Sequence, residues 1–261
     1  MTNTAAPRVT ASTAGNPATD RLSKPRIRRF EVIQALLDFF DRPRYLEVGV
    51  SKGTTFHRLE ARFKVAVDPR FRFDWQAEQA GRGPRTQYHE VTSDVYFGSI
   101  IDPTQEFDVI YLDGLHTFEQ TLRDFTNAVA HLAEGGVIVV DDVRPSSYHA
   151  SLSDPRSYQK LRQYVRDDRR AWMGDVYKLV WFIDTFYPSM SYATVANNHG
   201  QAVVWRERRR SVTERTVSEI GPLSFESMVL DHDVLRLRPF GEIVADLDGR
   251  IGRAKRGRRR K

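Results

Sequence analysis

The stretch Arg44-Tyr-Leu-Glu-Val-Gly-Val-Ser-Lys-Gly-Thr-Thr-Phe56 decides the fold of this chain. Its segment Tyr45–Val48 is apolar except for Glu47 and is typical of a short buried strand. Two glycines follow, and we expect a helix from near Thr54 to about Arg62. A strand that passes through glycines into a helix N-terminus brings free backbone N–H groups and a positive dipole end to a ligand. The stretch therefore predicts a ligand site at the end of the first strand.

A second signal is the acidic residue that ends the next strand. Asp68 closes the apolar run that starts at Lys64, and it lies 21 residues after Glu47. In nucleotide-binding βαβ units, an acid at this distance reaches the ribose hydroxyls. Glu47 can accept a hydrogen bond from a cationic or amine-bearing group, but it would repel a pyrophosphate, so a dinucleotide site fits less well. A strand, turn and helix without any ligand is the structural alternative for this stretch.

The acid-x-Gly-x-x-x-Gly pattern of Glu47, Gly49 and Gly53, with Asp68 behind it, resembles the cofactor motif of class I S-adenosylmethionine-dependent methyltransferases. The resemblance covers roughly residues 27–206. In that family, the loop after the third strand lies beside the adenine. The resemblance thus implies an S-adenosyl-L-methionine site formed by Glu47, Gly49, Ser51, Gly53, Asp68, Ser93, Asp94 and Asp113.

Strand and helix patterns alternate through the middle of the chain. Phe107–Asp113 and Val137–Val140 are apolar runs typical of buried parallel strands. Between them, Phe118–Leu132 carries apolar residues at helical spacing, and we expect Gly135-Gly136 to end that helix. These repeats predict an α/β fold with a Rossmann-like, doubly wound and mostly parallel sheet.

Composition divides the chain into four parts. Residues 1–25 are rich in Thr, Ala, Ser, Pro and Gly and are expected to be a disordered tail. Residues 26–206 are expected to form the methyltransferase-like domain. In it, Asp154–Arg170 predicts a polar helical insertion, and Ser191–Val195 with Gln201–Trp205 predicts a C-terminal antiparallel hairpin. Residues 207–249 are expected to form a helical appendage, and residues 250–261 a basic tail.

Charge and composition restrict the partners. The net charge is +6, but the last twelve residues carry eight basic side chains and no acidic one, and residues 30–249 carry about −7. An acidic body argues against nucleic acid as a partner. Without cysteine there is no disulfide framework, thiolate metal site or Cys nucleophile. No apolar run predicts a membrane span or signal peptide, so we expect a cytoplasmic protein. A homo-oligomer stays open.

Four polar residues follow two neighbouring strands. Asp113 ends the strand Phe107–Leu112, and Asp141-Asp142 directly follow Val140. The carboxyl ends of parallel strands meet at one edge of the sheet, where such folds bind ligands. His116 follows Asp113 by three residues and belongs to the same loop. We expect these side chains to lie close together.

The segments Leu112–His116 and Val140–Asp142 resemble the divalent-metal-dependent O-methyltransferases of the catechol and macrolide-sugar types. The resemblance implies that Asp113, Asp141 and Asp142 bind Mg²⁺ and that His116 is the general base. Oxygen ligands suit this ion, which would lower the pKa of a substrate hydroxyl. The alternative is a cofactor site without metal, in which Asp113 caps the helix that begins near Thr117.

The function expected from the resemblance is methyl transfer to a hydroxyl of a small-molecule acceptor, such as a sugar or a natural product. A nucleic-acid methyltransferase is an alternative suggested by the basic tail. However, the chain has no Cys nucleophile and no Asn/Asp-Pro-Pro-aromatic motif. A non-catalytic S-adenosylmethionine-binding module is the other alternative, and measured methyl turnover would separate it from an enzyme.

Overall fold

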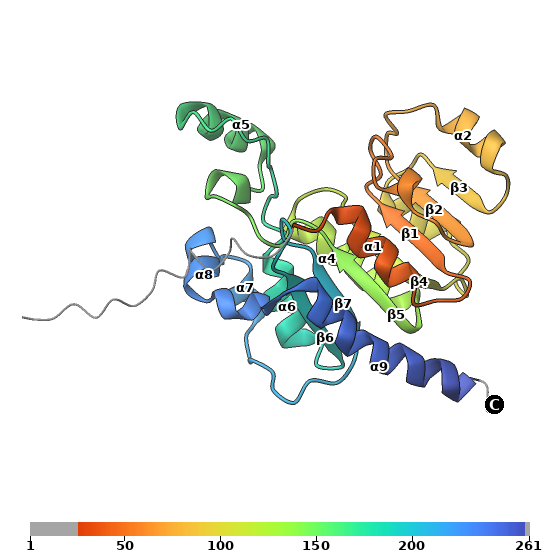
Figure 1. The fold of residues 1–261 in the computed structure, drawn as a ribbon. Helices are drawn as coiled ribbons and strands as arrows, with labels where there is room; N and C mark the ends of the chain where they lie inside the picture. Colours follow the sequence, from red (N-terminus) through yellow and green to blue (C-terminus); the bar gives the residue numbers. More distant parts are fainter. Residues whose placement is uncertain (1–25, 259–261) are drawn as a thin grey trace, which may run out of the picture.

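The centre of the protein is an eight-stranded sheet with the strand order β3-β2-β1-β4-β5-β7-β6-β8 (Figure 1). The computed structural model describes the backbone of residues 26–258 and the side chains of residues 26–249. The strands are β1 (Arg44–Val48), β2 (Phe63–Val67), β3 (Thr86–His89), β4 (Phe107–Leu112), β5 (Leu132–Val140), β6 (Met190–Val195), β7 (Ala202–Arg206) and β8 (Leu237–Arg238).

The sheet has a parallel half and an antiparallel half. Strands β1 to β5 are paired in parallel, β7 is antiparallel to both β5 and β6, and β8 is parallel to β6. The predicted Rossmann-like sheet and its C-terminal hairpin are therefore confirmed. The switch in direction between β5 and β7 brings the β6–β7 turn to the edge where β5 ends, because Val140 is opposite Ala202.

Helices cover both faces of the sheet. They are α1 (Arg29–Leu37), α2 (Trp75–Arg82), α3 (Ser93–Val95), α4 (Phe118–Ala130), α5 (Pro155–Tyr164), α6 (Lys178–Phe186), α7 (Val217–Ile220), α8 (Phe225–Leu230) and α9 (Phe240–Arg258). One apolar cluster joins one face of the strands to α4, α6 and α8, and a second joins the other face to α1 and α9. Neighbouring residues of a strand point to opposite faces, so Leu46 belongs to the first cluster and Tyr45 to the second.

The helix expected from Thr54 to Arg62 is wrong, because only a three-residue 3-10 turn, Phe56–Arg58, forms there. Two features explain the difference. The adjacent Thr54 and Thr55 are β-branched, which lowers helix propensity. The Lys64 ammonium donates hydrogen bonds to the carbonyl oxygens of Phe56 and Leu59, at 3.0 and 2.9 Å. An α-helix would need the Phe56 carbonyl for its own ladder.

The expected end of α4 at Gly135-Gly136 is also wrong. The helix ends at Ala130, and both glycines lie inside β5. The β4–β5 register shifts between Phe107 and Val109, and Gly135 has a φ of 76°. Glycine adopts this left-handed conformation at low cost, so the pair marks a bulge in a strand.

Helices α5 and α9 lie in segments for which the sequence predicted a helical insertion and a boundary at residue 249. The polar insertion does form a helix, α5, which stands away from the sheet in Figure 1. Helix α9 passes through the expected boundary at residue 249 as continuous helix to Arg258. The predicted disorder of residues 1–25 and the side chains of the basic tail lie outside the described residues.

Candidate active site

A cavity of about 1100 Å³ opens at the edge where β1, β2, β4 and β5 end. Its wall includes eight of the residues singled out in the sequence: Gly49, Ser51, Asp68, Ser93, Asp94, Asp113, His116 and Asp142. The cavity volume lies just above the usual range for small-molecule sites, roughly 300–1000 Å³. It is therefore large enough for a nucleoside-sized ligand together with a second small molecule.

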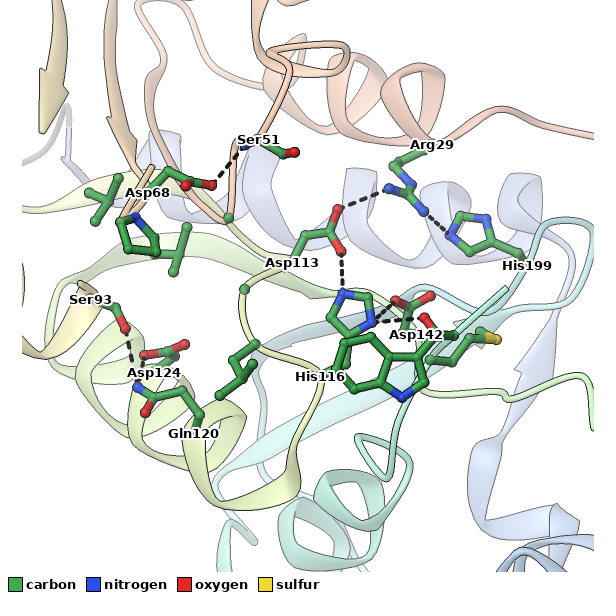
Figure 2. Close-up of a pocket in the computed structure, with 18 of the residues that line it drawn as sticks. Arg29, Ser51, Asp68, Ser93, Asp113, His116, Gln120, Asp124, Asp142 and His199 are labelled. Carbon is green, nitrogen blue, oxygen red and sulfur yellow. Dashed lines mark hydrogen bonds and ion pairs between the residues drawn. The ribbon is translucent and has the colours of Figure 1, made fainter. Parts of the chain in front are cut away.

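The β1–β2 side of the cavity is shaped by backbone hydrogen bonds to one carboxylate. Asp68 accepts from the N–H of Ser51 at 2.8 Å and from the N–H of Arg70 at 2.7 Å, so both of its oxygens hold the turn around it (Figure 2). Gly49 has a φ of 89°, and a Cβ there would lie 2.0 Å from the Asp113 carbonyl oxygen. The glycine thus allows the loop after β1 to approach the loop after β4.

Two residues of the predicted cofactor motif do not line the cavity. Glu47 is buried and accepts a hydrogen bond from the Tyr45 hydroxyl at 2.7 Å. Burial raises the pKa of Glu47 to about 8. Gly53 faces the ring of His57, whose nearest atom would lie 2.5 Å from an added Cβ. Their contact with a cofactor stays a prediction.

A polar cluster on α3 and α4 borders the cavity beside the end of β3. The Gln120 amide nitrogen lies 3.2 Å from Ser93 Oγ, 3.1 Å from Asp94 Oδ1 and 3.1 Å from Asp124 Oδ1. Burial raises the pKa of Asp124. Sequence reasoning named Ser93 and Asp94 but missed the other two, although Gln120 and Asp124 are four residues apart on α4 and so share a face.

His116 is held in a defined orientation by its surroundings. Its Nδ1 lies 2.9 Å from the Trp172 carbonyl oxygen, and the two rings stack at 5.1 Å with an angle of 22°. A carbonyl can only accept, so Nδ1 carries a proton and Nε2 of the neutral ring has a free lone pair. Gly174 lets this loop approach, since a Cβ there would lie 1.6 Å from the His116 carbonyl oxygen.

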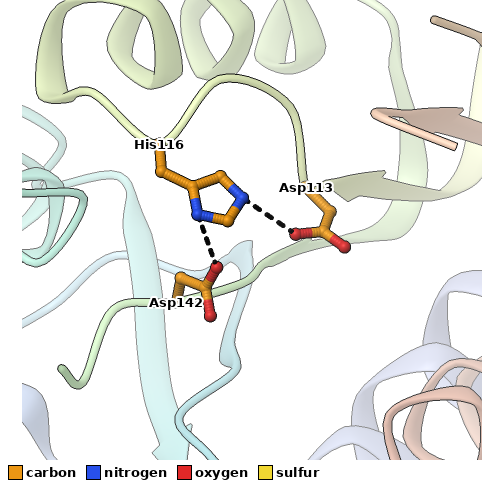
Figure 3. Close-up of side chains that lie close together, drawn as sticks. All are labelled: Asp113, His116 and Asp142. Atoms are coloured by element: carbon orange, nitrogen blue, oxygen red, sulfur yellow. Dashed lines mark ion pairs between the residues drawn. The ribbon is translucent and has the colours of Figure 1, made fainter. Parts of the chain in front are cut away.

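The free Nε2 faces Asp113 Oδ1 at 3.7 Å, and Nδ1 also lies 3.1 Å from Asp142 Oδ2 (Figure 3). Burial lowers the pKa of His116 below its ordinary value of 6.5. The ring is therefore mostly neutral at pH 7 and can accept a proton at Nε2.

The three predicted carboxylates meet, as the topology requires, but with different partners. Asp113 is grouped with His116 and Asp142, whereas Asp141 is grouped with Asp142 and His199. Within each group, the ligand atoms lie within 4.8 Å of one another. Carboxylate oxygens with one imidazole are a donor set that divalent ions accept. The residues therefore fit a metal ion.

Arg29 and His199 were missed by the sequence analysis. The Arg29 guanidinium donates from Nη1 to Asp113 Oδ2 and from Nε to Asp141 Oδ2, both at 2.9 Å. Its Nη2 lies 2.9 Å from His199 Nε2, which in turn lies 2.7 Å from Asp141 Oδ1. Arg29 is the first residue of α1 and His199 lies in the β6–β7 turn, and no local sequence pattern predicted either as a site residue.

The pKa shifts of Asp113, Asp141 and Asp142 indicate that this cluster holds more acidic groups than the nearby cations neutralise. Burial, followed by the charge of Asp141, raises the pKa of both Asp113 and Asp142 well above the ordinary value. Burial would also raise the pKa of Asp141, but the hydrogen bond to His199 and the charges of His199 and Arg29 hold it below its ordinary value. A further cation would stabilise the ionised cluster.

Comparison with known proteins finds a family model that matches the part of the chain around this site. Residues 46–143, from β1 to the loop after β5, match a family model described as a methyltransferase domain. This central part of the chain is therefore similar to a methyltransferase domain. The matched part of the chain includes the predicted cofactor motif as well as Asp113, His116 and Asp142.

Solved structures similar to this chain include enzymes of more than one acceptor type. The O-methyltransferase from Bacillus cereus, solved with SAH, is 18% identical, with 72% of this chain and 84% of that chain covered and a TM-score of 0.44. TomG from Streptomyces achromogenes, an O-methyltransferase of tomaymycin synthesis solved with SAM, is 14% identical (73% and 85% covered, TM-score 0.43).

The N-methyltransferase NodS from Bradyrhizobium japonicum WM9 is also 14% identical, with 69% and 93% covered and a TM-score of 0.42. No curated protein matches the sequence significantly. Among the described residues 26–258, no helix has the length and apolar character needed to cross a membrane.

Proposed function

We propose that the protein transfers a methyl group from S-adenosyl-L-methionine to a hydroxyl of a small molecule, with His116 as the general base. The observation that carries the proposal is the orientation of His116. Its Nδ1–H is held by the Trp172 carbonyl, and its free Nε2 points across 3.7 Å to Asp113 at the cavity wall. A base in this state takes a proton from a hydroxyl that enters the gap.

The cofactor would lie between the β1–β2 turn and the polar cluster of α3 and α4. Ser51, Asp68, Ser93 and Asp94 line this part of the cavity, and Asp68 can still accept from ribose hydroxyls while it shapes the turn. When bound, S-adenosylmethionine supplies a methyl group on a sulfonium, which is already activated for transfer. Positioning and deprotonation of the acceptor are what the chain must add.

The acceptor would lie on the His116 side, beside Leu115, Trp172 and Met173. As the acceptor oxygen forms its bond to the methyl carbon and the carbon–sulfur bond breaks, His116 Nε2 takes the hydroxyl proton. The ring then releases this proton to solvent. Tyr158 of α5 stacks on Trp172 at 6.5 Å, so the insertion supports this wall of the acceptor site.

Asp113, Asp141 and Asp142 would hold a divalent cation such as Mg²⁺ in this proposal. Such an ion would supply a positive charge that binds the acceptor oxygen and lowers its pKa. The buried carboxylates support this part of the proposal because their charge is only partly compensated by Arg29.

The test is to incubate the protein with methyl-labelled cofactor and a library of hydroxylated small molecules, and to measure label in the products. We expect label to be transferred to hydroxyl groups. Carboxylic acids, amines and nucleic acids serve as negative controls and should stay unlabelled. Calorimetric binding of the cofactor without transfer to any acceptor would instead support a non-catalytic binding module. Label on an amine or on nucleic acid would contradict the proposed acceptor.

A further inference from the structure

The guanidinium of Arg29 lies between the two carboxylates expected to bind a metal. It reaches Asp113 Oδ2, Asp141 Oδ2 and His199 Nε2, each at 2.9 Å, from the first residue of α1 (Figure 2). These three partners come from the ends of β4 and β5 and from the β6–β7 turn. A single side chain from the N-terminal helix thus joins three separate parts of the sheet edge.

A divalent ion held by Asp113 and Asp141 would compete with this guanidinium for the same two carboxylates. Mg²⁺ requires its oxygen ligands at about 2.0–2.1 Å in an octahedral arrangement. Asp113 Oδ2 and Asp141 Oδ2 are already donated to by the same planar cation, which lies between them. A second cation at these carboxylates would also be repelled by the positive charge of the guanidinium.

We propose that Arg29 is a built-in cation that occupies the metal position, so that a divalent ion binds to Asp113 and Asp141 only after Arg29 withdraws. The inference rests on the metal-binding part of the proposed function. It assigns to the start of α1 the control of metal binding at the site.

The fold allows Arg29 to leave without unfolding α1. The buried side chains that anchor this helix begin at Val32 and continue with Ile33, Leu36 and Leu37. Arg29 precedes them, and its side chain is 36% exposed, so solvent already reaches it. The segment before it is held to the β6–β7 turn by the hydrogen bond from Ile27 N to Asn197 O, at 3.1 Å. The movement therefore needs the loss of a few polar contacts at the end of a helix.

The test measures Mn²⁺ binding to the whole protein, by calorimetry and by the electron paramagnetic resonance of free Mn²⁺, without cofactor or acceptor. We expect Arg29→Gln to bind Mn²⁺ at least about tenfold more tightly than wild type, because the competing charge is gone. Arg28→Gln is the matched control. Arg28 is the preceding residue and directs its guanidinium to Glu31 and to the ring of Phe30, so its loss should leave the affinity unchanged.

A second variant keeps the test informative if Arg29→Gln does not fold. Lysine retains the charge of arginine but lacks the planar guanidinium that contacts Asp113, Asp141 and His199 together. We expect Arg29→Lys to keep Mn²⁺ affinity closer to wild type than to Arg29→Gln. Equal or weaker Mn²⁺ binding by folded Arg29→Gln would overturn the inference, and so would Arg29→Lys binding Mn²⁺ more tightly than wild type by tenfold.

These outcomes are separate from those of the methyl-transfer assay. Methyl transfer by a protein whose variants never bind Mn²⁺ would overturn the inference and leave the proposed acceptor chemistry in place. Tighter Mn²⁺ binding by Arg29→Gln would support the inference even if no hydroxylated acceptor were methylated.

Discussion

The two sides of the cavity hold their acidic residues in different ways. At the ends of β1 and β2, Asp68 is held by two backbone N–H groups that lie two and seventeen residues away. At the ends of β4 and β5, Asp113 and Asp141 face each other and are held by Arg29, which is 84 residues from Asp113. The first arrangement is local and set by backbone geometry. The second depends on charges brought from distant segments, so a single substitution can change it more easily.

The largest effect is expected from the charged side. His116→Ala should lower kcat by roughly 10²–10⁴, the usual scale for loss of a general base, while cofactor binding stays intact. Because burial lowers the pKa of His116, the wild-type rate should fall only as the pH drops below about 6.5. The defect of the variant should shrink at alkaline pH, where the acceptor loses its proton unaided. A pH–rate profile of both proteins measures this, and an unchanged rate at neutral pH would remove His116 from the mechanism.

Gly49→Ala should disturb both sides of the cavity, because Gly49 lies where the loop after β1 meets the loop after β4. The residue has a φ of 89°, and its Cβ would meet the Asp113 backbone, so we expect a loss of about 2–5 kcal/mol in unfolding free energy. Gly83→Ala is the matched control, since Gly83 has a φ of 68° with open space around it. It should cost only the backbone strain, about 1–2 kcal/mol. Urea unfolding measures both, and equal losses would mean that the approach of the two loops is not tight.

Asp68→Asn tests the backbone-defined side alone. The amide has one acceptor oxygen, so the turn keeps only one of its two hydrogen bonds and the ribose loses a charged acceptor. We expect cofactor affinity to fall by about ten- to a hundredfold, which corresponds to roughly 1.4–2.8 kcal/mol. Metal affinity should be unaffected. Calorimetry with S-adenosylmethionine and separately with Mn²⁺ would show whether the two sides are independent.

The smallest expected effect concerns Glu47, which lies beneath both sides. Its folded-state pKa, about 8, is above the ordinary 4.5, so the ionised form destabilises the fold. This penalty is absent below pH 4.5 and grows as the pH rises towards 8. Glu47→Gln should therefore raise Tm at pH 8 by at least about 2 °C, with a much smaller gain at pH 5. A Tm difference that is the same at both pH values would contradict the buried, protonated carboxyl.

The sequence predicts the features set by local patterns, but not the contacts made between distant segments. The parallel sheet, the hairpin and the meeting of Asp113, Asp141 and Asp142 follow from apolar strands and from the rule that their carboxyl ends share an edge. Arg29 and His199 do not follow, since no local pattern tells which distant residue will neutralise a carboxylate. The glycine pattern also did not reveal that Lys64 donates a hydrogen bond to the Phe56 carbonyl, which a helix after Phe56 would need.

The two-residue strand β8 has a consequence for how the chain can be handled. Thr194 N donates to Arg236 O, and Ala196 N donates to Arg238 O, so this short segment covers the outer side of β6. A strand whose edge groups are unpaired is a template for pairing with another molecule. A chain cut before Leu237 would expose this edge and, because Phe240, Ile243 and Leu247 are lost with α9, the apolar sheet face against which they pack. Such a truncated protein would be expected to aggregate, even though the cavity lies at the ends of the strands and none of its wall would have been removed.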